Sequence, residues 1–295
     1  MTRTDIVHFP RERYQRPGVY RRRLRVQTGP GWSHAAMEDD PHHYALELRH
    51  DGTQVTAITA QAIRTPWTTC ADATRPLQRL VGMVLSPDLQ QVWRHANGRE
   101  QCTHLFDLAG LAVAHAAREI ACRDYEAEVP CQDPGARRDA VLRVDGAEAL
   151  RWTLQRNLVV APEPFAGQDV AAMSAWAKQR FVDRDRLQAV LLLRRAVFVA
   201  GHRFFDLDRM QRASETGHVG DACYVFRDGV AEHALRVPGA TREFRHGGEL
   251  LADDGGAAVG AAADPIAPAV AQPPVGAQVA SDVSASAPVP AGIAR

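Results

Sequence analysis

The chain has 295 residues, with 35 basic and 35 acidic side chains, so its formal net charge at pH 7 is zero. A balanced charge excludes a general affinity for polyanions, and we expect no nucleic-acid partner. Five cysteines are too few for a disulfide framework in a chain of this length. Because no apolar stretch is long enough for a membrane span and no signal peptide is evident, we expect no membrane partner, a cytoplasmic location and reduced thiols.

The residue pattern predicts four parts along the chain. They are an N-terminal arm at 1–30 around a short strand, a hairpin-plus-helices module at 31–126, a smaller mixed module at 139–248, and a disordered Ala/Pro-rich tail at 250–295. The tail is expected to be disordered because its few large apolar residues cannot offset the entropy of ordering. We therefore predict the α+β class, with an antiparallel hairpin or sheet packed against helices, and we expect truncation after Glu249 to leave stability intact.

Residues 42–64 predict the hairpin. Apolar and polar residues alternate through Tyr44, Leu46 and Leu48, which is the period of a half-buried strand. Asp51-Gly52 is a strong two-residue turn signal, and the second strand should end before Pro66.

Two helices are expected after the hairpin. The first should begin at a Thr68 or Thr69 cap and stop at Gly82, with a kink at Pro76. The second should run over about 102–122, because small and apolar residues recur there three or four positions apart.

The second half of the chain predicts a mixture of strands and helices. After a linker at 127–138, the expected elements are strands at 140–144 and 150–160 around an Asp-Gly turn, a helix at 168–181, an apolar run at 189–205 that fits a helix or a strand, and closing strands at 224–226 and 233–237.

Cys70 and Cys102 are the leading functional candidates because each is expected where a helix begins. A helix N-terminus favours thiolate, which is the form that binds metals and attacks electrophiles. Zinc and iron sites in proteins use Cys, His and carboxylate ligands. The predicted ligand set for zinc, iron or an iron–sulfur cluster is Asp40, His42, His43, Cys70 and Cys102.

The two neighbouring histidines should differ in orientation. Successive side chains of a strand point to opposite faces, so only one of His42 and His43 can face the cysteines. We expect it to be His42, which shares its face with Tyr44.

Two other functions fit the same residues. A thiol-dependent enzyme acting on a small molecule would use Cys70 or Cys102 as the nucleophile, with His104 nearby and Asp107 fixing its tautomer. His104, two residues after Cys102, is expected to point away from that thiol. A purely structural or interaction module with buried cysteines is the third possibility.

Arg194 and Arg195 lie within an apolar run and should have an anionic partner. That partner is either an anionic substrate or cofactor in a cleft, or a structural acid such as Asp183 or Asp185.

Several segments resemble a bacterial family known as domain of unknown function 2889, and this resemblance implies no activity. The segments are Met37–His43, Arg64–Cys70, Cys102–Leu108, Leu192–Ala196 and Ala222–Tyr224.

Residues 42–118 are similar to the NifU-like iron–sulfur scaffold proteins in the order of their parts: a hairpin, then Cys70 opening a helix that ends at Gly82, then Cys102 opening a second helix. The resemblance implies a NifU- or SufE-like module and an accessory protein with a partner in metal or sulfur handling. In place of the scaffold's first Cys-Gly-Asp, this chain has residues 39–43, and Gln101 replaces the histidine before the last scaffold cysteine.

Overall fold

The computed structural model describes residues 14–216, 223–244 and 249–252. These residues belong to one compact unit that spans Met1–Gly255, and the expected tail from residue 253 onward lies outside the described residues. No helix in the described part of the chain is both long enough and apolar enough to cross a membrane.

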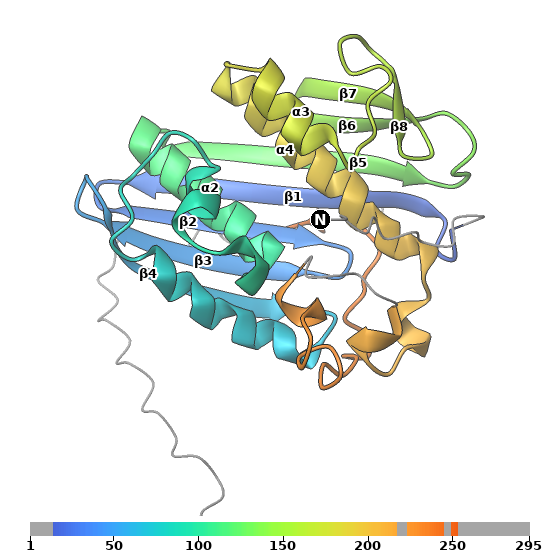
Figure 1. Ribbon diagram of the computed structural model, residues 1–295, viewed down its shortest axis with the longest axis horizontal. Coiled ribbons are helices and arrows are strands. Elements are labelled where there is room, and N and C mark those ends of the chain that lie inside the picture. The colour runs from blue at the N-terminus through green and yellow to red at the C-terminus, as the bar shows by residue number, and fades with distance from the viewer. Residues whose placement is uncertain (1–13, 217–222, 245–248, 253–295) are drawn as a thin grey trace, which may run out of the picture. The chain divides into compact units, whose positions relative to one another are not determined.

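One antiparallel sheet of eight strands organises the fold, in the order β4-β3-β2-β1-β5-β6-β7-β8 (Figure 1). The strands are β1 (Gly18–Gly29), β2 (Trp32–Asp39), β3 (His43–His50), β4 (Val55–Arg64), β5 (Cys122–Cys131), β6 (Arg138–Val144), β7 (Ala147–Gln155) and β8 (Leu158–Ala161). The predicted α+β class is confirmed, as are the hairpins of β3 with β4 and of β6 with β7.

Helices follow the strands in both halves of the chain. The α-helices are α1 (Gln91–His95), α2 (Thr103–Arg118), α3 (Met173–Arg180) and α4 (Arg184–Val199). The 3-10 helices are η1 (Thr68–Leu80), η2 (Gly98–Glu100), η3 (Ala200–Phe204), η4 (Leu207–Arg209), η5 (Ala213–Thr216) and η6 (Tyr224–Phe226).

β1 lies in the middle of the sheet, although the sequence indicated only a short strand within an arm. It pairs with β2 on one side and with β5 on the other, so the two modules expected from the sequence share one sheet. The linker predicted at 127–138 begins too early, because residues 127–131 belong to β5. Tyr125, Ala127 and Val129 of β5 are buried at alternate positions, which is a strand pattern.

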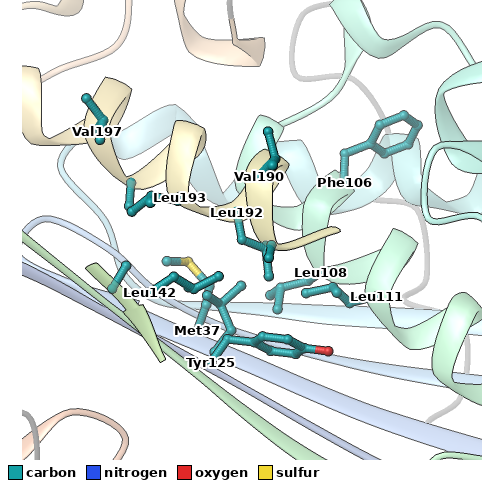
Figure 2. Close-up of a cluster of buried hydrophobic side chains, with 14 of the residues drawn as sticks. Met37, Phe106, Leu108, Leu111, Tyr125, Leu142, Val190, Leu192, Leu193 and Val197 are labelled. Atoms are coloured by element: carbon teal, nitrogen blue, oxygen red, sulfur yellow. The ribbon is translucent and has the colours of Figure 1, made fainter. Parts of the chain in front are cut away.

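The main core lies between this sheet and two long helices. Helix α2 packs on β1, β2 and β3, and α4 packs on β5, β6 and β7. Figure 2 shows side chains of both helices directed toward the strands, where Leu108 and Leu111 of α2 and Leu192 of α4 approach Met37 and Tyr125. Burial of these side chains is the main force that holds the helices on the sheet.

The run at 189–205, which fitted a helix or a strand, is helical, in α4 and η3. The two expected closing strands are wrong, because residues 224–226 form η6 and residues 233–237 contribute only isolated bridges. Helix α2 ends at Arg118, where Glu119 adopts a left-handed conformation, and not near Cys122. The N-cap of η1 is Trp67, and not Thr68 or Thr69 as expected. The Thr68 hydroxyl accepts a hydrogen bond from the Leu235 N–H instead of capping the helix.

The predicted start of the tail at residue 250 is also wrong. Leu250 and Leu251 are 2% and 3% exposed, and the Leu251 N–H donates to a Glu38 carboxylate oxygen at 2.8 Å. Two adjacent leucines supply enough apolar area to hold this segment on the protein. Truncation after Glu249 would therefore remove part of the fold.

A buried histidine in the core predicts a dependence of stability on pH. His115 of α2 meets the Tyr125 hydroxyl at 2.9 Å, and burial lowers the pKa of His115 from 6.5 to about 4. In the unfolded chain the His115 side chain takes up a proton near pH 6.5, whereas in the folded protein it does so only near pH 4. The free energy of unfolding should therefore fall by at most about 1.4 kcal/mol per pH unit as the pH drops through this window.

The measurement is chemical unfolding of the wild type and of His115→Gln between pH 7.5 and pH 4.5. The unfolding free energy of the wild type minus that of the variant should stay constant above pH 6.5 and decrease below it. Parallel curves across the whole range would show that His115 does not carry this linkage.

Candidate functional site

A cavity of about 150 Å³ is lined by residues of the turn between β2 and β3, of the start of α2 and of the end of α4. Cys70 of η1, Cys102 and His104 line it, together with His42 from the turn between β2 and β3. With Arg195, which also lines it, the cavity brings together five of the predicted site residues. Other residues of the lining include Tyr44 and Cys223.

The start of α2 places a thiol and an imidazole side by side. Cys102 is the N-cap of α2 and has an extended backbone, with φ −71° and ψ 124°. Because Cys102 is not itself helical, its side chain does not diverge from that of His104 as expected on a helix. The Cys102 Sγ atom lies 3.8 Å from His104 Nδ1.

His42 connects this helix start to the end of β2. The rings of His42 and His104 lie with their centroids 4.0 Å apart. On the other side, both the backbone N–H and Nδ1 of His42 lie 2.9 Å from Asp39 Oδ1. One ligand atom from each of Asp39, His42 and His104 lies within 4.8 Å of the other two, and within the described residues this is the one such group of three.

The Asp39 carboxylate is fixed in place by the sheet. Its Oδ2 atom accepts from the Tyr20 hydroxyl at 2.7 Å and from Arg22 at 3.3 Å, and Arg22 is directly opposite Asp39 in the β1–β2 register. Burial alone would raise the pKa of Asp39, but His42 and Arg22 lower it well below its usual range. Asp39 is therefore an ionised and rigidly held carboxylate.

Both histidines of the group are neutral. Burial lowers the pKa of His42 despite the nearby Asp39, and burial together with His42 lowers the pKa of His104 well below its usual value. His104 is 6% exposed, and its Nε2 atom has no hydrogen-bond partner in the part of the chain that the structure describes. A buried imidazole nitrogen without a partner is costly unless something binds it.

The three cysteines of the cavity differ in protonation. Burial raises the pKa of Cys70 to about 12, and a hydrogen bond to Cys223 together with burial raises that of Cys102 well above its usual value. The same bond, with Cys102 as donor, lowers the pKa of Cys223. The expectation that helix starts make Cys70 and Cys102 thiolates is wrong, because burial outweighs the helix dipole.

Two members of the predicted ligand set lie elsewhere. The Asp40 carboxylate is 2.6 Å from Arg203 in a buried ion pair and does not line the cavity. As expected, His42 lines the cavity and His43 does not, although His42 lies in the turn before β3 and not in the strand itself. His43 faces Glu38, which is its register partner on β2, at 3.7 Å.

The remaining predicted residues form structural contacts. Asp107 pairs with Arg195 at 2.7 Å and does not reach back to His104. Arg194 donates to the carbonyls of Val170 and Ala171. Neither arginine pairs with Asp183 or Asp185, because Asp183 caps α4 and Asp185 binds Arg118. Arg195 still lines the cavity, with its charge already matched by Asp107.

Sequence reasoning missed Asp39, Tyr44 and Cys223 as site residues. The two-residue period of β3, continued back from Tyr44, falls on His42 and Asp40. It does not identify Asp39, because the turn between β2 and β3 breaks the period. Cys223 is more than 100 residues from Cys102 in sequence, so no local pattern connects the two.

Comparison with known proteins adds a match to one family model but no activity. Residues 25–118 match the model of a family described as a protein of unknown function, DUF2889, which the sequence motifs also resemble. No curated protein matches the chain. The matched stretch contains Asp39, His42, Cys102 and His104, and therefore the whole Asp–His–His group with its neighbouring thiol.

Proposed function

We propose that this protein binds one divalent metal ion through Asp39, His42 and His104. The observation that carries this proposal is the convergence of three ligand atoms within 4.8 Å of one another, on side chains from a strand end, a turn and a helix start. The buried, unpartnered Nε2 atom of His104 supports it, because a metal or its bound water would satisfy that nitrogen.

The chemistry of the three ligands favours zinc or ferrous iron. Two imidazoles and one carboxylate form catalytic zinc sites and also the facial triad of non-haem iron, and both leave a coordination position open. Neutral histidines are ready to donate a lone pair, and the low pKa of Asp39 keeps its carboxylate ionised. Tyr20 and Arg22 hold the second oxygen of Asp39, which is a typical outer-shell arrangement.

Cys102 is the thiol best placed to join this set. Ligands at about 2.3 Å (sulfur) and 2.0 Å (nitrogen) from a tetrahedral zinc lie about 3.5 Å apart. The observed 3.8 Å between Cys102 Sγ and His104 Nδ1 is close to that value, so Cys102 is a ligand if the metal binds Nδ1 of His104 and an outer-shell contact if the metal binds the unpartnered Nε2. A bound metal would also deprotonate the thiol, whose pKa is otherwise raised. Cys70, on the same cavity wall, is the next candidate.

The alternatives have less support. Iron–sulfur clusters are held mostly by cysteine thiolates, whereas the group here is formed by nitrogen and oxygen atoms. The scaffold role implied by the NifU-like resemblance therefore fits less well than a single ion. A thiol enzyme using Cys70 or Cys102 would need a thiolate, whereas burial raises the pKa of Cys70 and the hydrogen bond to Cys223 raises the pKa of Cys102.

The test is titration of chelator-treated protein with Co²⁺, followed by elemental analysis of protein purified from zinc- or iron-supplemented medium. We expect one ion per chain in the wild type, none in His42→Ala or His104→Ala, and weaker binding in Cys102→Ser. The matched control is His43→Ala, since His43 is adjacent in sequence and buried but does not line the cavity. A metal-free wild type, or full occupancy in His104→Ala, would refute the proposal.

A further inference from the structure

The cavity beside the proposed metal site has a second, apolar part. Trp67, Phe198, Phe205 and Phe226 line it, together with Val199 and Leu207. Trp67 directly precedes η1, Phe198 and Val199 end α4, Leu207 begins η4 and Phe226 ends η6. Four rings from distant segments form a wall suited to a flat apolar molecule.

Among the described residues, the one arginine of the cavity lining already has its charge matched, because Arg195 is paired with Asp107 at 2.7 Å. The polar side chains of the lining include Cys102, His104 and His202. A ligand that fits this arrangement has an apolar body and a polar atom at one end only.

The size of the cavity limits the ligand. Its volume of about 150 Å³ equals that of an engineered protein cavity that holds benzene. Phe198 lines the cavity and is 38% exposed, so the aromatic wall reaches the protein surface.

We propose that this cavity binds a small molecule with a single aromatic ring, which packs against Trp67 and Phe198 and directs one donor atom toward His104. The part of the inference that concerns the donor atom rests on the proposed metal site, since that atom would occupy the open coordination position. The part that concerns the ring rests only on the apolar wall.

The experiment uses two probes on the full chain. Toluene tests the apolar wall of metal-free protein, and phenylmethanethiol tests the donor end of protein loaded with Zn²⁺; binding of both is measured by calorimetry. Val199→Phe and Leu207→Phe fill the cavity and should abolish toluene binding. Val182→Phe is the matched control, because Val182 is 98% exposed and lies outside the cavity. Thermal melts establish that each variant is folded.

We expect toluene to bind the wild type and Val182→Phe but neither cavity-filling variant, and phenylmethanethiol to bind more tightly with Zn²⁺ than without it. The proposal would be overturned, whatever the metal content, if toluene did not bind the wild type. It would also be overturned if toluene bound Val199→Phe and Leu207→Phe as tightly as the wild type. Toluene binding by a protein that takes up no metal would support the apolar site and refute the metal function, so the two failures are distinguishable.

Discussion

Asp39→Asn is expected to lower the free energy of unfolding by about 3–5 kcal/mol, which is the usual effect of removing one partner of a buried ion pair. Arg22 is 1% exposed and Asp39 is fully buried, so the substitution leaves a guanidinium in the interior without its carboxylate. The same change removes the negative charge beside His42 Nδ1 and replaces a proposed carboxylate ligand of the metal with a neutral amide. Metal affinity should fall by at least about tenfold.

The measurements are denaturant unfolding and Co²⁺ titration of the folded variant. Asp139→Asn is the control, because Asp139 forms an exposed ion pair with Arg151 and exposed pairs contribute about 1 kcal/mol or less. If Asp39→Asn and Asp139→Asn are equally stable, the buried pair does not have the structural role assigned to it. If Asp39→Asn is destabilised but binds metal as tightly as the wild type, Asp39 is not a ligand.

A chain that ends at Glu249 should be less stable than one that ends at Ala252 by about 3–6 kcal/mol, since burying one leucine stabilises by about 1.5–3 kcal/mol. Leu250 and Leu251 are both buried, and the Leu251 N–H satisfies one oxygen of the buried Glu38 carboxylate. The other Glu38 oxygen binds Arg64 at 2.9 Å. Removing the leucines therefore also leaves a buried carboxylate oxygen without its donor.

Unfolding of the two truncated chains under identical conditions measures this difference directly. Leu251→Ala in the full chain is an internal check, and it should cost about 2–5 kcal/mol if the side chain is packed as observed. Coincident unfolding curves of the two truncated chains would mean that residues 250–252 do not contribute to the fold.

The sequence by itself determined the features that depend on near neighbours. Alternating residues around Asp51-Gly52 and Asp145-Gly146 predicted two hairpins, because side-chain period and turn chemistry are local properties. The small and apolar stripe after Cys102 predicted α2 for the same reason. Strand alternation also predicted which of His42 and His43 faces the cavity.

Only the tertiary structure decided the order of the sheet and the composition of the site. β1 pairs with β5, about 100 residues later, and no local pattern encodes such a distant partner. That pairing makes β1 a central strand of the sheet. The β1–β2 register sets Arg22 opposite Asp39, which in turn holds His42. The protonation of Cys70 and Cys102 likewise depends on burial by distant segments, which outweighs the local effect of a helix start.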